Sequence, residues 1–344
     1  MASVVTAVVL SLVVLGIIGG FTLEGTTLSR IARVNPLGLL LAAMTVAVRV
    51  LCGTWRLHFV SKGRLKWAGA LRAQLAWDFF SNVTPSTIGG GPITPAYIVR
   101  DSHIRLGEAT SIMLFAMLMD QIWFALAIVV VLVSGFWLEI IPAALGRLGN
   151  VTFTVYFLAF MFWVCLFGYA TLVRPRILER FMDMVFRLRW LNRIHRRVLD
   201  MMAHLREHAH VLRTQRPGFY VKGFVLTVLV WLSRYLLVVV LLWSVFPNVD
   251  VLLAFFRTVA MMLGALVLPT PGGTGGIEGL YALMVGPLIP DALLAVTLFS
   301  WRLLGYYVFV AAGVYLTVRQ ADRALRGKKS ETSAIQSELR QLRS

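Results

Sequence analysis

Long apolar stretches constrain this chain more than any other feature, because each is near or above the roughly 20 residues that a helix needs to cross a bilayer. With 58% hydrophobic and only 14% charged residues, the 344-residue chain cannot hide so much apolar surface in one water-soluble core. We therefore predict an all-α integral membrane protein with six full transmembrane helices. The predicted spans are residues 4–21, 36–55, 109–133, 151–173, 219–246 and 292–318.

The first stretch is expected to remain in the protein as a helix. Residues 4–21 lack a basic segment before the apolar run and a convincing small-residue cleavage site. Both features are typical of a secretory signal peptide that is removed. A retained transmembrane helix is the simpler interpretation.

Two further apolar segments are interrupted by proline and glycine. Residues 67–99 contain SNVTPSTIGGGPITP, and residues 251–289 contain VLPTPGGTGGIEG. Proline ends the entering helix, and glycine lets the chain turn with positive φ. Non-helical backbone at membrane depth must be covered by protein or face a water-filled cavity. We therefore predict two re-entrant helical hairpins whose tips lie inside the protein.

The 33 Lys and Arg residues exceed the 16 Asp and Glu residues by 17, and they lie between the apolar stretches rather than in one basic domain. This pattern favours contact with anionic lipid headgroups, and it argues against a nucleic-acid partner. Positive charge concentrates in residues 56–72, in residues 174–216 and after residue 318, so we place these regions and both termini in the cytoplasm. The expected location is the cell (inner) membrane of a bacterium or archaeon.

This topology gives the two hairpins opposite orientations, and spacing relates the halves that contain them. Arg49 lies 35 residues before Thr84, and Arg234 lies 36 residues before Thr270; each threonine precedes a proline and several glycines. We interpret the halves as inverted-topology repeats, a plan that secondary transporters use to place a site at the midplane. The predicted organisation is one membrane domain at 1–318 with repeat halves at 36–134 and 219–318, an amphipathic cytoplasmic helical segment at 174–217, and a charged cytoplasmic tail at 319–344.

Charged side chains inside the apolar segments identify a candidate site. Each costs about 2.5–3.5 kcal/mol on insertion scales, so each needs a partner or a task. The half-helix after each turn also offers free N–H groups and a positive dipole end to a phosphate or carboxylate. The predicted substrate-binding residues are Arg49, Asn82, Thr84, Gly89, Gly90, Asp120, Arg234, Thr270, Gly272, Gly273, Gly275, Glu278 and Arg302.

Other roles stay open for these groups. Glu278, in the first turn of its half-helix, could neutralise an arginine, bind a cationic headgroup or titrate. Arginine and carboxylate could instead pair structurally across the repeat interface without touching a substrate. We expect Asp78 and Arg257, which lie nearer the hairpin ends, to be interfacial.

These residues resemble a known family. NVTPSTIGGGP followed by AYIV, then LPTPGGTGGIEG, with Arg49, Asp120 and the run RLLGYY from Arg302, look like the lysylphosphatidylglycerol synthase transmembrane region, also called the flippase domain family. The resemblance covers almost the whole chain. It implies a membrane domain of the kind that moves aminoacylated phosphatidylglycerol between leaflets in the bacterial multiple peptide resistance factor. Many relatives have Glu, Gln or Asp where this chain has Gly91, which leaves Glu278 as the remaining motif carboxylate.

Enzymatic activity is not expected. The resemblance implies that bifunctional synthases append a soluble acyltransferase-like domain, for which the segment after residue 318 is too short, so a lipid-modifying enzyme would be a separate partner chain. The run HLREH at His204 to His208 fits an inverted zinc-protease pattern, but no distal acidic ligand accompanies it, and we interpret it as a solvated helix face. Cys52 and Cys165 have no paired spacing. We expect neither a metal nor a cofactor.

Three functions remain open. The leading hypothesis is a lipid flippase that moves a phosphate-bearing headgroup through a midplane cavity, where the substrate is an anionic or aminoacylated phospholipid or a polyprenyl phosphate carrier. The second is an ion-coupled transporter of a small soluble anion, which needs a sealed aqueous path. The third is a non-transporting scaffold for a lipid-modifying enzyme.

Overall fold

A computed structural model describes most of the membrane domain. The described residues are 16, 35–84, 90–102, 104–143, 146–172, 215–268, 270 and 272–320. They form helices, turns and loops, and no strand occurs among them. The predicted span at 4–21 apart from Gly16, Gly89, nearly all of the segment 174–217 with its HLREH run, and the tail beyond residue 320 lie outside the described residues.

Four described helices are long and apolar enough to cross a membrane, so the chain is a multi-pass membrane protein. They are α3 (Pro36–Val60), α6 (Leu106–Ser134), α10 (Pro217–Val245) and the helix Asp291–Gln320, which starts as α13 (Asp291–Arg302) and continues through a π-helical turn, η4 (Leu303–Tyr307). A further helix, α7 (Gly146–Leu172), falls on the predicted span at 151–173.

The two interrupted segments form pairs of shorter helices. The first pair is α4 (Trp67–Val83) and α5 (Gly90–Ser102); the second is α11 (Val251–Gly264) and α12 (Gly276–Met284), flanked by the 3₁₀ turns η2 (Ala265–Val267) and η3 (Gly286–Leu288). At 1.5 Å per residue, the 17-residue α4 spans about 25 Å, which is less than a hydrocarbon core of about 30 Å. That these pairs re-enter the membrane stays a prediction.

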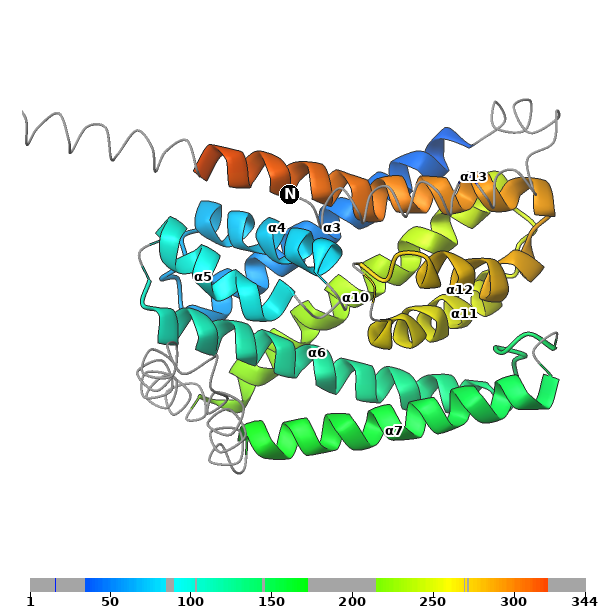
Figure 1. The fold of residues 1–344 in the computed structure, drawn as a ribbon, viewed down its shortest axis with the longest axis horizontal. Helices are drawn as coiled ribbons and strands as arrows, with labels where there is room; N and C mark the ends of the chain where they lie inside the picture. The colour runs from blue at the N-terminus through cyan, green and yellow to red at the C-terminus, as the bar shows by residue number, and fades with distance from the viewer. Residues whose placement is uncertain are drawn as a thin grey trace, which may run out of the picture.

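The same order of elements occurs twice: a long helix, two short helices and a second long helix. The first long helices of the halves, α3 and α10, are antiparallel, because the Asn35 amide at the start of α3 donates to the Ser244 carbonyl near the end of α10 at 3.1 Å. In Figure 1, α4 and α5 lie on one side of the diagonal α3 and α10, and α11 and α12 lie on the other. An inverted repeat requires this antiparallel relation.

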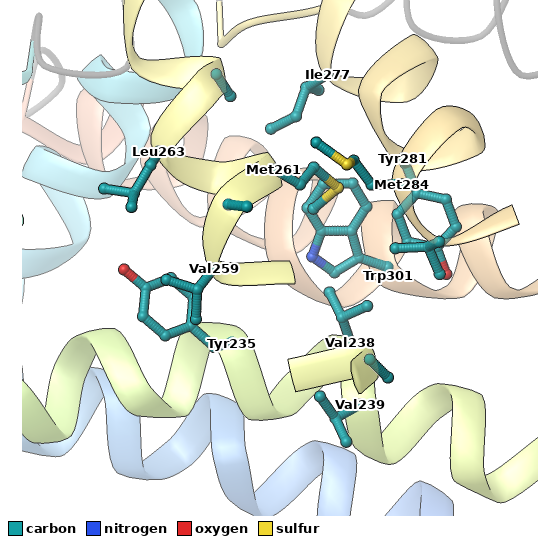
Figure 2. Packing of buried hydrophobic residues seen from close by; sticks show 14 of the residues in the cluster. Tyr235, Val238, Val239, Val259, Met261, Leu263, Ile277, Tyr281, Met284 and Trp301 are labelled. Atoms are coloured by element: carbon teal, nitrogen blue, oxygen red, sulfur yellow. The ribbon is translucent and has the colours of Figure 1, made fainter. Parts of the chain in front are cut away.

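The main apolar core joins the second half to α6 and α7. Figure 2 shows its centre, where side chains of α10, α11, α12 and α13 converge. Tyr281 of α12 stacks on Trp301 of α13 with ring centroids 5.2 Å apart, and Tyr281 is fully buried. A second core packs α3, α4, α5 and α6 together. Each hairpin is therefore held by a different core.

The two hairpin turns touch each other between these cores. The Gly272 amide donates to the Thr84 carbonyl at 3.3 Å, which ties the turn after η2 to the end of α4. Gly272 has a φ of 60°, and a Cβ there would lie 2.6 Å from the Asn82 carbonyl oxygen. Glycine is therefore required both by the left-handed backbone and by the close approach of the other turn.

Replacing Gly272 with Ala should lower the free energy of unfolding by at least about 1–3 kcal/mol, because strained backbone and a backbone clash act together. The measurement is the thermal unfolding midpoint of the purified protein in detergent. Gly279→Ala in α12 is the matched control, since a Cβ there meets nothing within 4 Å. Equal midpoints for the two variants would contradict the close contact of the turns.

The structure corrects one predicted boundary. The apolar pattern predicts a span that ends at residue 55 and places Arg56 among the charges of a cytoplasmic loop. The helix α3 instead runs to Val60, and Arg56 is 2% exposed. Its guanidinium is held inside the protein by partners on two other helices, so it contributes nothing to loop charge.

Candidate functional site

Two arginines and one carboxylate from three helices meet where the halves join. Asp78 of α4 accepts hydrogen bonds at Oδ1 from Arg49 Nη2 of α3 at 2.5 Å and from Arg234 Nη2 of α10 at 2.8 Å. Its Oδ2 accepts from the Gln74 amide, one helical turn earlier, at 3.0 Å. The Asp78 side chain is 1% exposed, so the expectation that it is interfacial was wrong. One buried carboxylate therefore accepts hydrogen bonds from two guanidinium groups.

The two arginines differ in how firmly they are held. Arg49 also donates to the Gly305 carbonyl in the π-helical turn and lies over the Phe309 ring, with Cζ 4.1 Å from the ring centroid; its side chain is 7% exposed. Arg234 lies over the Trp231 ring at 4.5 Å, and 25% of its side chain is exposed. Arg49 is thus a fixed counter-ion, whereas Arg234 presents part of its guanidinium to open space.

That open space is a cavity of about 90 Å³ between the two hairpins, bounded by the Arg49–Asp78–Arg234 group. We call it the central cavity. Among its lining groups, Asn82 Nδ2 and Arg234 Nε are buried donors without a hydrogen-bond partner among the described residues. Its wall therefore offers donors to a ligand with acceptor oxygens. The remaining lining residues are Ser81, Trp231, Leu237, Met262, Ala265, Leu266, Gly272, Ile277, Trp301, Arg302, Gly305 and Tyr306.

A second cavity of about 40 Å³ lies between α3, α4, α6 and α10, and we call it the side cavity. Its main ion pair joins Arg56 Nη1 to Asp120 Oδ1 at 2.6 Å; the same nitrogen donates to Thr227 Oγ1 at 3.1 Å. The indole N–H of Trp231 also donates to Asp120 Oδ1, at 2.9 Å. Trp231 and Arg234 line both cavities and stand between them.

Glu278 and Arg302 form a third ion pair, within the second half. Arg302 Nε donates to Glu278 Oε1 at 2.8 Å and Arg302 Nη2 donates to the same oxygen, while Glu278 Oε2 accepts from the Gly275 amide at 2.7 Å. Glu278 thereby caps its own helix α12. It is fully buried and does not line either cavity.

The pairing leaves one positive charge. Arg56 balances Asp120, and Arg302 balances Glu278. Arg49 and Arg234 share only Asp78. Four guanidinium groups therefore meet three carboxylates at these described positions, and the excess positive charge lies at the wall of the central cavity.

The structure brings only part of the predicted site to the cavities. Arg49, Asn82, Arg234, Gly272 and Arg302 line the central cavity, and Asp120 lines the side cavity. Other members of the predicted set have local roles. The Thr84 hydroxyl donates to the Phe80 carbonyl at the end of α4, and Gly90 lets α5 approach the α4 backbone closely. The turn glycines Gly273 and Gly275 have positive φ. Thr270 lines neither cavity.

Comparison with known proteins fits this arrangement. Residues 4–313 match the sequence profile of the family described as the lysylphosphatidylglycerol synthase TM region, and this match spans both hairpins and both cavities. The chain belongs to this family. A UPF0104 membrane protein of Archaeoglobus fulgidus is 22% identical to the chain over 316 residues, which are 89% of this chain and 93% of that protein. Membership in the lysylphosphatidylglycerol synthase TM region family is consistent with a lipid-related role in the membrane.

Sequence reasoning missed several residues of this family member's site. Asp78 and Arg56 carry two of its ion pairs, and Gln74 and Trp231 orient them. One signal was available: Gln74 and Asp78 lie four residues apart and therefore on one face of a helix. Arg257 is 5% exposed and donates to the carbonyls of Glu139 and Met284, so it is held inside the protein, and its position at the membrane interface stays a prediction.

Proposed function

We propose that this protein moves a phosphate-bearing lipid headgroup between the two leaflets of the membrane, with Arg234 as the side chain that binds the phosphate. The observation that carries the proposal is the sharing of Asp78 by Arg49 and Arg234 at the wall of the central cavity. The unbalanced positive charge there matches an anion, and a partly exposed guanidinium can bind phosphate oxygens with two parallel hydrogen bonds.

The neighbouring polar groups support a phosphate in particular. Asn82 Nδ2 and Arg234 Nε are buried donors that lack partners among the described residues. Phosphate oxygens are acceptors, so binding would satisfy groups whose burial is otherwise unfavourable. Acyl or polyprenyl chains would stay in the bilayer while the headgroup passes the two hairpin turns. A phospholipid and a polyprenyl phosphate carrier present the same phosphate, and the assay below separates them.

The proposal includes no bond making or breaking. Guanidinium groups, amides and indole rings surround the central cavity, and these groups bind and orient a headgroup. We infer an arrangement with the start of α3 outside, cytoplasmic termini, re-entrant hairpins and a location in the cell (inner) membrane. A lipid-modifying enzyme, where one acts on the same lipid, would be a separate partner.

Replacing Arg234 with Gln should slow leaflet exchange about tenfold to a hundredfold, since a charged hydrogen bond contributes about 1.5–3 kcal/mol. The test uses liposomes with fluorescent phosphatidylglycerol, phosphatidic acid or a polyprenyl phosphate, in which a membrane-impermeant quencher reports the leaflet. Folding should survive the substitution, because Arg49 then balances Asp78 alone. Lys222→Gln is the matched control: it removes a cation from the same helix, where Lys222 lies over Trp55 and Phe59 outside both cavities.

Equal exchange by the wild type, Arg234→Gln and empty liposomes for every lipid would overturn the proposal. Uptake of soluble phosphate that depends on Arg234, without lipid exchange, would favour the small-anion transporter. If a folded Arg234→Gln protein replaces the wild type in cells without any change in phenotype, the scaffold hypothesis is favoured.

A further inference from the structure

The side cavity holds polar groups that the proposed phosphate site does not use. It shares Ser81, Trp231, Arg234 and Leu266 with the central cavity, so the two cavities meet at Arg234. A phosphate bound by Arg234 could therefore extend a substituent into the side cavity. At about 40 Å³ this cavity has room for a small group of a few heavy atoms.

Three buried polar atoms of the side-cavity lining lack hydrogen-bond partners among the described residues. They are the acceptors Gln74 Oε1 and Gln121 Oε1 and the donor Arg56 Nε. Gln74 is 2% exposed and Gln121 is 5% exposed. The Gln74 amide nitrogen donates to the Asp78 carboxylate, and the Gln74 oxygen packs against Gly53 of α3, so Gln121 Oε1 is the acceptor that remains for a ligand.

A hydroxyl group fits this set better than an ammonium group. A hydroxyl both donates and accepts, so it can donate to Gln121 Oε1 and accept from Arg56 Nε, whereas an ammonium group only donates. Two guanidinium groups, Arg56 and Arg234, line the side cavity beside the single carboxylate of Asp120, which Arg56 already binds. A further cation would therefore be repelled.

Both tryptophan rings of the side cavity already lie under a guanidinium group of the protein. Arg56 lies over the Trp77 ring at 5.0 Å, and Arg234 lies over the Trp231 ring at 4.5 Å. One face of each indole is thus occupied by the protein's own guanidinium groups, which leaves less ring surface for a ligand cation. Resting on the proposed function, we propose that the side cavity is a second subsite that binds an uncharged, hydroxyl-bearing substituent on the lipid phosphate.

The test compares three acyl-labelled lipids with the same acyl chains in proteoliposomes. Phosphatidylglycerol carries hydroxyls, phosphatidylethanolamine an ammonium group, and phosphatidic acid no substituent. The wild type should exchange phosphatidylglycerol about tenfold faster than the other two, in line with hydrogen bonds to buried polar groups. Gln121→Leu should reduce phosphatidylglycerol exchange to the phosphatidic acid rate.

Two further variants sharpen the result. Gln121→Glu places a carboxylate in the side cavity and should shift the preference toward phosphatidylethanolamine. Gln320→Leu makes the same change as Gln121→Leu at the end of the last described helix, away from both cavities, and should leave the preference unchanged. Folding should tolerate Gln121→Leu, because it removes a buried acceptor without a partner among the described residues.

The outcomes separate the inference from the function on which it rests. The subsite would be overturned, and the phosphate site kept, by one result: phosphatidic acid exchanges as fast as phosphatidylglycerol, and this exchange depends on Arg234 but is unaffected by Gln121→Leu. A wild-type preference for phosphatidylethanolamine that Gln121→Leu abolishes would overturn the uncharged character of the substituent. No Arg234-dependent exchange of any lipid would overturn the proposed function itself.

Discussion

Replacing Asp78 with Asn should lower the free energy of unfolding by about 3–5 kcal/mol, the typical loss when one partner of a buried ion pair is removed. The loss falls at the upper end of that range here, because Arg49 and Arg234 both depend on this carboxylate and both remain buried or partly buried without it. The thermal unfolding midpoint of the purified protein in detergent measures the effect.

A matched control lies in the same hairpin. Asp101 of α5 pairs with Arg72 at 2.8 Å, but the Arg72 side chain is 34% exposed and stays hydrated when its partner is removed. Asp101→Asn should therefore change stability by no more than about 1 kcal/mol. A drop for Asp78→Asn no larger than for Asp101→Asn would contradict the central role of Asp78.

The same variant also tests the anion site. With the carboxylate removed, an added anion can take its place between the two guanidinium groups. Inorganic phosphate should therefore raise the unfolding midpoint of Asp78→Asn more than that of the wild type, because a ligand stabilises the state that binds it. Chloride at the same ionic strength is the control, and adding Arg234→Gln should remove the difference.

The apolar stretches predicted the long helices because length and hydropathy decide which segments can cross a bilayer. The helices α3, α6, α10 and Asp291–Gln320 fall on four of the predicted spans. The spacing of Arg49 and Arg234 before their threonine-proline pairs also identified two charges that meet. Both signals are local, and a single sequence contains them.

The partners of those charges depend on packing that the sequence does not display. Asp78 lies 29 positions from Arg49 and 156 from Arg234, and only the packing of α4 beside the paired helices α3 and α10 brings them together. Arg56 looked like a loop charge because counting basic residues cannot tell an exposed arginine from one that pairs with Asp120. The partner of each charged side chain is therefore set by contacts between helices, which the local sequence pattern does not show.

For Glu278, too, the sequence predicts the position in a helix but not the ion-pair partner. Its place in the first turn of a half-helix was predicted correctly, and there it caps the Gly275 amide. Its partner Arg302 is 24 residues further on, beyond η3, and is reached only because α13 folds back along α12. The carboxylate that the sequence marked for the substrate is instead fully buried with an arginine.

Replacing Glu278 with Gln should likewise destabilise the protein by about 3–5 kcal/mol, since Arg302 would stay buried without a carboxylate and the cap of α12 would weaken. Glu108→Gln is the control, because its partner Arg64 has a side chain that is 62% exposed and can hydrate. Adding Arg302→Gln to Glu278→Gln should recover part of the loss, as residues in contact are not additive.

This variant decides between a structural and a transporting carboxylate. If Glu278 only holds the second hairpin, lipid exchange by the Glu278→Gln protein should fall in proportion to the folded fraction, and the folded molecules should keep the wild-type rate and headgroup preference. A protein as stable as the wild type that no longer moves lipid would contradict this assignment. It would mean that Glu278 separates from Arg302 during transport and acts on the headgroup or a proton.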